Sequence, residues 1–590
     1  MQRSRSQVLF SYLPESVYIH ESGLTVRSYS VRGEGIGDAI NKEVLLKEVD
    51  RYLNNWTEEN QQGFPNSLAS NRNEVTIETP EQVRYEVWPL VFECTNEMCK
   101  RIRTVRTLDE ISAHPKCLYC RFPIRQLRYF SAHQCGAIRQ MYVPKCDAHG
   151  YDDVYFEDTG SFLTAVFRCR ACGGQIVRRT AQTPCGCTFT DPDGRAMMRA
   201  YTVRDTRTFY AHYVPLINFQ SNAFKRFQEH PERGSIAVAS YLGLIESVGE
   251  ALQEAEDTRS DRMSADKWAD AETKYRTMGL SEEDIHTLKK SKGPKEYGLA
   301  AVRDIPQSII EVGARRQVVE RAMLFDKEHH PEHSLDSARA EAEKRGQVAA
   351  VARLDMARKQ ASAMGIEAIH VTWDFPIALA AFGYTRGSKD PNDSRIHSFR
   401  KRDQYQGKVP IFAVATKTEA VILTLSPVEV LRWLANAGHH PGPVPEDSLS
   451  AKTAILAAFA AEELTPEPAT AVRTLVHSVA HCMLRALGDG QVGFAESSLA
   501  EWVVPETLTV AIYANTLSSD TLGAFWTLIN NRTLEWLENS KQGVYTCEND
   551  PLCHQRDPRA CERCMFLSFG CQMFNDNLSR KTLAHFWLHA

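Results

Sequence analysis

Residues 547–571 read CENDPLCHQRDPRACERCMFLSFGC and contain five of the chain's 16 cysteines. Four of these cysteines form two pairs separated by a short insert: Cys547, Cys553, Cys561 and Cys564. Zinc prefers four ligands in a tetrahedral arrangement, and this spacing lets short loops present both pairs to one ion. The sequence therefore predicts a closed structural zinc site. Cys571 exceeds the four ligands needed and is assigned to packing, with His554 as an alternative ligand.

Ten further cysteines lie between Cys94 and Cys187, whereas residues 188–481 contain none. Eight of them form two more sets of paired cysteines, with inserts of 17 and 12 residues between the pairs. The first set is Cys94, Cys99, Cys117 and Cys120, and the second set is Cys169, Cys172, Cys185 and Cys187. Both sets match the four-thiolate pattern, so the sequence predicts three structural zinc ions in total.

Two histidines and two cysteines lie between these sets. His133 and Cys135 are separated by one residue, and Cys146 and His149 by two. Two cysteines and two histidines are a common zinc ligand set, which makes these residues candidates for an additional site. The alternative is that they are core residues, since cysteine and histidine are often buried. Their spacing alone does not decide between the two interpretations.

The composition is that of a globular protein with several domains. The chain has 590 residues, a formal net charge of -5 and 43% hydrophobic residues. We find neither an apolar run near the ~20 residues of a membrane span nor a signal-peptide pattern, so a cytoplasmic location is expected. Disulfides are rare in that reducing compartment, which leaves metal binding as the first explanation for the cysteines.

The slightly acidic balance excludes a globally basic nucleic-acid coat but permits local basic surfaces. Basic residues cluster beside the cysteine loops and in one later segment, although solvated surface is the commoner reason for such runs. The candidates for nucleic-acid contact are Arg101, Arg103, Arg170, Arg178, Arg400, Lys401 and Arg402. Tyr119, Phe122 and Tyr129 are candidates for base stacking, with burial as the alternative.

The pattern of residues predicts an α+β multidomain chain. Residues 1–85 form an N-terminal α+β segment, and residues 86–230 form a zinc-ribbon region. Residues 231–368 show apolar residues at three- and four-residue spacing, which indicates a helical domain. Residues 369–590 return to a mixed α/β pattern around the C-terminal cysteine set.

Two segments of the last region carry clear local signals. Residues 408–425, KVPIFAVATKTEAVILTL, suggest two strands around a polar turn at 416–418. The segment that follows is a predicted helix, in which Ser426 is the N-cap and Glu429 completes a capping box.

Residues 470–487 form a second predicted helix, which places His477 and His481 on one face. We expect both histidines to pack in a helix–sheet core or to hydrogen-bond an acid such as Glu496 or Glu501, with a metal or phosphate role as the alternative. We find no Walker A loop, HExxH, G-x-S-x-G or zinc-deaminase motif. The sequence therefore offers no recognisable catalytic site.

Several motifs of residues 369–590 occur in a characteristic order. They are FGYTRGS at 382–388, KVPIFAVATKTEAVIL at 408–423, LVHSVAHCMLRAL at 475–487 and AESSLAEWV at 495–503, followed by the cysteine set. This order resembles the zinc-bearing domain at the C-terminus of MrfA-type DNA-repair helicases. As a separate chain with further cysteine pairs upstream, the protein is similar to the DrmB family of DISARM phage-defence systems.

The resemblance implies a non-catalytic DNA-binding subunit that associates with a separate helicase of the DrmA type, and with other subunits of a defence complex. The lack of a P-loop agrees with a motor supplied by a partner. Two other classes of function stay open at this point: a purely structural adaptor that binds protein, and an uncharacterised nuclease.

Overall fold

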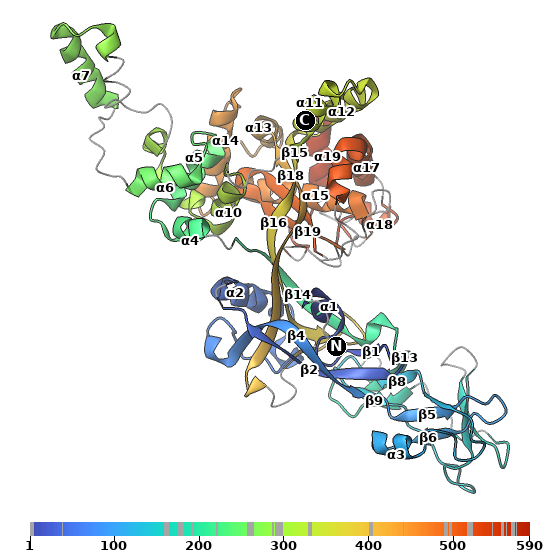
Figure 1. The fold of residues 1–590 in the computed structure, drawn as a ribbon. Helices are drawn as coiled ribbons and strands as arrows, with labels where there is room; N and C mark the ends of the chain where they lie inside the picture. The colour runs from blue at the N-terminus through green and yellow to red at the C-terminus, as the bar shows by residue number, and fades with distance from the viewer. Residues whose placement is uncertain are drawn as a thin grey trace. The chain divides into compact units, whose positions relative to one another are not determined.

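The structure is a computed structural model with a mixed α+β fold (Figure 1). It describes residues 5–37, 39–158, 165–174, 176, 182–189, 194–219, 222–256, 265–285, 288, 299–327, 333–399, 405–440, 442–488, 494, 498–515, 523–545, 547–555, 560–561, 563–567, 571, 573 and 575–589. None of the helices in these ranges has the length and apolar character needed to cross a bilayer.

The chain divides into two compact units, each made of two segments. The first unit comprises Met1–Asn218 and Ala378–Ala415, and the second comprises Phe219–Ile377 and Thr416–Ala590. The expected helical stretch over 231–368 lies within the second unit and supplies helices α5 (Arg233–Leu242) to α12 (Val348–Ser362). The three upstream groups of cysteines all lie in the first unit, and the C-terminal group lies in the second.

The first unit contains a mixed sheet covered by a helix. Its strands β1 (Val17–Ile19), β2 (Thr25–Gly35) and β4 (Val75–Val87) are antiparallel neighbours, and β4 also pairs in parallel with Val409–Phe412. Helix α2 (Lys42–Leu53) begins at Asn41, whose side chain accepts the Val44 N–H. The buried face of α2 packs in one core with residues of β4 and of β14 (Tyr210–Ile217). The remaining small elements of this sheet region are α1 (Arg5–Ser11), β3 (Gln61–Gln62) and β17 (Ile396–Ser398).

Residues 91–202 of the same unit form three small antiparallel sheets. One has the order β6-β5-β7, one is the hairpin β10-β11, and one has the order β12-β13-β8-β9. Their strands are β5 (Val91–Cys94), β6 (Ile102–Thr104), β7 (Ile124–Gln126), β8 (Tyr129–Ala132), β9 (Ile138–Gln140), β10 (Val154–Glu157), β11 (Val166–Cys169), β12 (Gln182–Pro184) and β13 (Met197–Thr202). Helix α3 (Leu108–Ala113) follows β6 and begins with a capping box from Thr107 and Glu110.

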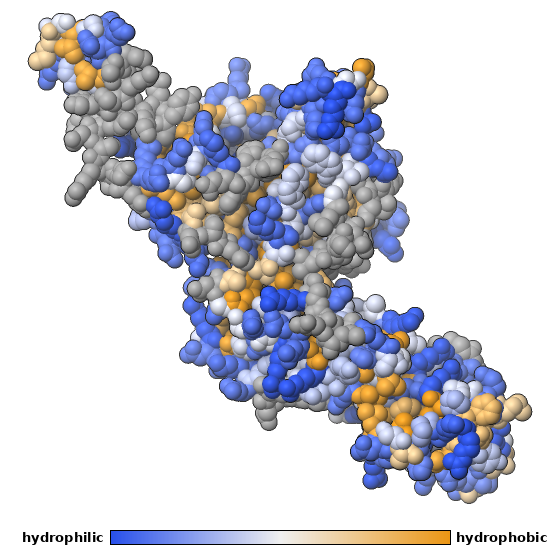
Figure 2. Space-filling model, viewed as in Figure 1, coloured by the Kyte–Doolittle hydropathy of each residue, from blue (hydrophilic) through white to orange (hydrophobic). Residues whose placement is uncertain are grey.

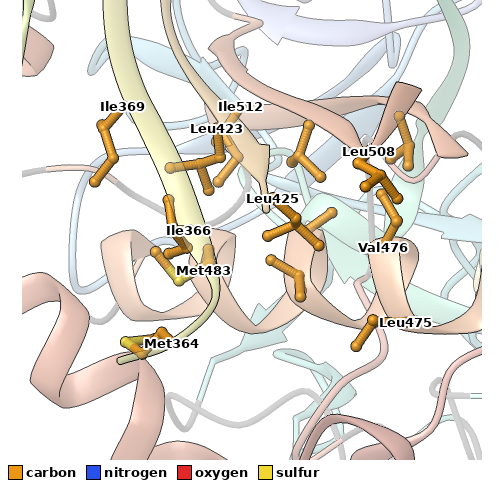
Figure 3. Packing of buried hydrophobic residues seen from close by; sticks show 14 of the residues in the cluster. Met364, Ile366, Ile369, Leu423, Leu425, Leu475, Val476, Met483, Leu508 and Ile512 are labelled. Atoms are coloured by element: carbon orange, nitrogen blue, oxygen red, sulfur yellow. The ribbon is translucent and has the colours of Figure 1, made fainter. Parts of the chain in front are cut away.

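The second unit is largely helical. Its other described helices are α4 (Asn222–Glu229), α6 (Val248–Glu256), α7 (Ala265–Thr277), α9 (Gln307–Gly313), α10 (Arg316–Leu324), α11 (Leu335–Lys344), α13 (Pro427–Asn436), α14 (Ser448–Ala460), α15 (Pro466–Gly488), α16 (Ala524–Thr527), α17 (Thr533–Tyr545), α18 (Leu552–Gln555) and α19 (Arg580–His589). Strands β15 (His333–Ser334), β19 (Leu499–Val504) and β20 (Thr509–Ala514) complete it together with parts of two long strands. The α15 helix packs against β19 and β20, and its buried face joins the main core (Figure 3).

The two long strands are β16 (Ile366–Thr385) and β18 (Val409–Leu425), and each contributes to both units. The turn expected at 416–418 is wrong, because β18 continues without interruption through these residues. They are Thr, Lys and Thr, so none of the usual turn residues is present and the β-branched threonines favour a strand. Lys417 is exposed and pairs with Asp374 of β16 at 2.9 Å, so this polar residue marks an exposed position of the strand and not a turn. Ser426 caps α13 as expected, although the Glu429 carboxylate pairs with Arg432.

Candidate metal centres

Five groups of four side chains converge within the described residues. In each group the four ligand atoms, one from each side chain, lie within 4.8 Å of one another. The expected number of three centres is therefore too low. Four groups contain at least three cysteines, and none of the chain's cysteines forms a disulfide. The measured Sγ–Sγ distances within the groups are 3.4–3.8 Å. Four sulfurs around a zinc ion with bonds of about 2.3 Å would lie about 3.8 Å apart, so these groups fit tetrahedral zinc.

The first group contains the expected set Cys94, Cys99, Cys117 and Cys120. Cys94 is the last residue of β5, and the other three lie in loops that close back on this strand. The buried sulfurs form a small cluster of their own, and Ile124 packs against it. Burial opposes ionisation of Cys99, but hydrogen bonds from the backbone N–H and the guanidinium of Arg101 lower its pKa to about 7. Cys99 therefore forms the thiolate that a metal requires more readily than Cys94, whose pKa is raised by burial.

The second expected set is wrong as a group, because its two pairs lie in different centres. Cys169 and Cys172 meet Cys146 and His149, whereas Cys185 and Cys187 meet His133 and Cys135. All four residues proposed for an additional site therefore lie in metal-type groups, but they too divide into two pairs. The two centres are nested in the sequence. The outer pairs, His133 with Cys135 and Cys185 with Cys187, share one centre, and the inner pairs, Cys146 with His149 and Cys169 with Cys172, share the other.

Strand pairing explains this partition. In the hairpin β10-β11, Val154 pairs with Cys169, so the loop before β10 meets the loop after β11. The loop before β10 carries Cys146 and His149, whereas Cys169 ends β11 and Cys172 lies in the loop after it; His149 Nδ1 lies 3.5 Å from Cys169 Sγ. The outer pairs follow β8 and β12, which both end beside the start of β13. Cys135 Sγ and Cys185 Sγ therefore lie 3.5 Å apart although 50 residues separate them.

A glycine allows the loop after β8 to close tightly. Gly136 has a φ of +86° and donates its N–H to the His133 carbonyl at 2.9 Å. A Cβ atom at this position would lie 2.1 Å from the ring of His397. The His397 ring instead contacts the Cys135 carbonyl at 2.8 Å, which fixes the backbone of the ligand loop. Only glycine fits this conformation and this close contact.

The C-terminal group in the second unit consists of Cys547, Cys553, Cys561 and Cys564, as expected. The N–H of Cys564 donates to the Cys561 carbonyl at 3.1 Å, which forms a tight turn between these two cysteines. Arg580, at the start of α19, is nearly fully buried and binds Asp550 at 2.8 Å, so it anchors the loop between Cys547 and Cys553. The side chain of His554 lies outside the described residues.

A fifth group contains two histidines, an acid and the surplus cysteine. His477 and His481 of α15 lie 3.0 and 3.3 Å from the Glu501 carboxylate of β19, so one of the two expected acids does lie beside them. Glu496, the other expected acid, lies outside the described residues. Cys571 joins the group, and burial together with the Glu501 charge raises the pKa of its thiol. The sequence signal for this group was the histidine pair one turn apart, but the acid and the cysteine come from distant segments.

The basic candidates divide into described and undescribed residues. Arg178, Arg400, Lys401 and Arg402 lie outside the described residues. Arg101 binds Asp153 and stacks on Tyr119 at 3.5 Å from the ring centroid, and Arg170 donates to the Cys99 carbonyl. Arg103 donates to the carbonyls of Glu110 and His114. These contacts hold the metal loops together, and they use only some of the five N–H donors of each guanidinium.

A groove of about 1240 Å³ lies beside the first metal centre in the first unit. We call it the tyrosine groove and define it by Arg101, Arg103, Tyr119, Arg139, Tyr142 and Tyr151. The three tyrosines are 72%, 67% and 54% exposed. Figure 2 shows orange apolar side chains at the lower right, where Figure 1 labels β5, β6 and β9. Of the aromatic residues expected to stack on bases, Tyr119 and Phe122 are exposed, whereas Tyr129 is buried and packs in a core.

One comparison with known proteins gives a match. A family model described as a domain of unknown function (DUF8724) matches residues 4–210, which lie within the first unit and include its three metal-type groups. No curated protein matches the chain.

Proposed function

We propose that the chain is a non-catalytic, zinc-stabilised DNA-binding subunit that works with a separate helicase in a cytoplasmic anti-phage defence complex. The tyrosine groove is the observation that supports DNA binding. The helicase partner, of the DrmA type, and any other defence subunits rest on the sequence resemblance to MrfA-type and DrmB proteins.

The groove suits a single strand because it combines exposed rings with positive charge. Proteins that bind single strands stack successive bases on aromatic side chains and follow the backbone with basic groups. Tyr142 and Tyr151 present exposed rings, and Arg103 and Arg139 line the same groove. Arg139 also donates to the Cys185 carbonyl at 2.7 Å, so its position depends on a metal loop.

The metal-type groups support a scaffold function. Zinc held by four protein ligands has no open position for water or substrate, so it organises loops and does not activate water. We propose that zinc occupies the four cysteine-rich groups and fixes the loops that form the groove. Removal of the ion next to the groove would then disorder the binding surface.

Fluorescence anisotropy with a labelled single strand of mixed sequence tests this function. Tyr142→Ala and Tyr151→Ala should each weaken binding by about 5- to 150-fold, since stacking contributes about 1–3 kcal/mol per base. Tyr545→Ala is the matched control, because Tyr545 is similarly exposed but lies on α17. Arg103→Gln should reduce the salt dependence by about 0.7 in log–log slope if Arg103 neutralises one phosphate.

Three outcomes would contradict the proposal. Unchanged affinity in both tyrosine variants would exclude the groove as the binding surface. No DNA retention at low salt, with or without the helicase, but stable helicase binding would favour the structural adaptor. Divalent-dependent cleavage of DNA by the chain alone would favour the nuclease.

A further inference from the structure

Four side chains from three distant segments meet inside the second unit. His477 and His481 on α15 are fully buried, and Glu501 on β19 is nearly so. Cys571 Sγ lies 3.3 Å from His477 Nε2 and 3.2 Å from His481 Nε2. The Glu501 carboxylate contacts the same two nitrogens. Both imidazoles therefore direct the same ring nitrogen toward one point.

The backbone fixes the tautomer of both histidines. His477 Nδ1 lies 2.8 Å from the Asp576 carbonyl, and His481 Nδ1 lies 2.6 Å from the Met565 carbonyl. A carbonyl oxygen only accepts hydrogen bonds, so both Nδ1 atoms carry the proton. In a neutral imidazole the other nitrogen then presents a lone pair. Both Nε2 atoms consequently present lone pairs to Glu501 and Cys571.

The group therefore places four potential metal-ligand atoms around one point. Two imidazole lone pairs face a carboxylate oxygen, and the thiol of Cys571 supplies one proton at most. A divalent cation satisfies all four groups at once, and its binding releases the thiol proton.

We propose that His477, His481, Glu501 and Cys571 form a fifth metal centre, which binds Zn²⁺ as a closed structural site. Two imidazoles, one carboxylate and one thiolate are all accepted zinc ligands. Tetrahedral zinc with bonds of about 2.0–2.3 Å holds such atoms about 3.3–3.6 Å apart. The four measured contacts, at 3.0–3.3 Å, are within a few tenths of an ångström of that geometry.

The surroundings match those of a metal ligand set. Histidine ligands usually donate their second N–H to a carbonyl or carboxylate, as both do here. The Asn575 N–H donates to Cys571 Sγ at 3.1 Å, and the Asn575 side chain bonds the backbone of Leu567 on both sides. These hydrogen bonds hold Cys571 in place beside α15.

The fifth centre would join the C-terminal segment to the helical core. The Met565 carbonyl that orients His481 follows directly after Cys564, a residue of the C-terminal cysteine group. The two centres of the second unit thus share one short segment, residues 564–571. An ion at the fifth centre would hold this segment against α15 and β19.

Metal counting on the purified full-length chain tests the proposal. Mass spectrometry of the elements should find five zinc ions per wild-type chain, and four in Cys571→Ala and in His477→Gln. Cys482→Ala is the matched control, because Cys482 is the buried neighbour of His481 and its thiol bonds the Ser540 carbonyl. The control should keep five ions.

X-ray absorption of the wild type provides a measurement that needs no variant. Five occupied centres average 3.0 sulfur and 1.0 nitrogen or oxygen ligands per zinc, whereas the four cysteine-rich centres alone average 3.5 and 0.5. Four zinc ions per chain, with an average of 3.5 sulfur and 0.5 nitrogen or oxygen ligands, would overturn the proposal. A bound water would then explain the group. Five ions in both variants, or a redox-active metal lost from both, would also overturn it.

Discussion

The structure and the sequence spacing make opposite predictions about which of the upstream ligands share a metal ion. Cys169 and Cys185 belong to different centres in the structure, whereas Cys146 and Cys169 share one. Spacing predicts the reverse. We therefore expect Cys169→Ser with Cys185→Ser to remove two zinc ions per chain, and Cys146→Ser with Cys169→Ser to remove only one.

The magnitude follows from the ligand count. A centre that loses one of four ligands keeps three, and a centre that loses two keeps two, but either retains at most one ion. Structural zinc sites bind with apparent free energies of about 10–16 kcal/mol at neutral pH, so intact centres should survive dialysis against a moderate chelator that strips the damaged ones. The lost ions are therefore a whole-number difference between the two double variants.

The assay is zinc and protein quantification on dialysed full-length chain, with circular dichroism to confirm folding. Cys482→Ala serves as control, because Cys482 is buried but lies in none of the five groups. Loss of one ion from the Cys169 and Cys185 double variant, together with loss of two from the Cys146 and Cys169 variant, would refute the strand-pairing argument.

Three further predictions concern stability. Arg386 is fully buried and donates to the carbonyls of Gly136, Thr208 and Glu15. Arg386→Met should therefore lower the free energy of unfolding, measured by urea denaturation, by about 3–5 kcal/mol. A loss no larger than that caused by Arg432→Met, at an exposed arginine, would contradict this prediction. Burial lowers the pKa of His212 to about 3, so below about pH 6.5 the unfolded chain binds a proton that the folded chain does not. Stability should therefore fall with falling pH by up to about 1.4 kcal/mol per unit, and the pH profile of His212→Gln should lack this component; identical profiles would show that His212 does not contribute. Strong chelation should make residues 91–187 the first to be cleaved in limited proteolysis, because three of the metal-type groups hold the loops there. Protection of this region without metal would argue against zinc as its scaffold.

The cysteine pairs could be recognised from the sequence because each pair is a local feature. Two residues a few positions apart are held together by one turn, as in the Cys561 and Cys564 turn. The first and last sets were grouped as expected, whereas the second was not, although its 12-residue insert is shorter than the 17-residue insert of the first. Local rules also gave the Ser426 cap and the α+β character of the chain.

The same local rules failed where a longer-range contact decides. The polar residues at 416–418 suggested a turn, but β18 continues as a strand beside β16, and β20 pairs with it from Ala420 onward. The Glu501 and Cys571 ligands are 24 and 94 residues from His477, and no spacing rule connects them. The histidine pair alone was compatible with an ordinary core.

The sequence by itself determined which residues are suited to bind metal, because ligand chemistry and the geometry of a short turn depend only on neighbouring residues. The tertiary structure decided which pairs share an ion. Antiparallel pairing of β10 with β11 joins the inner pairs, and the shared neighbour β13 joins the outer ones. Those choices depend on strand partners as far apart in the chain as Tyr129 and Thr202, about 70 residues, and the free energy of pairing distant strands is not encoded in the spacing of the ligands.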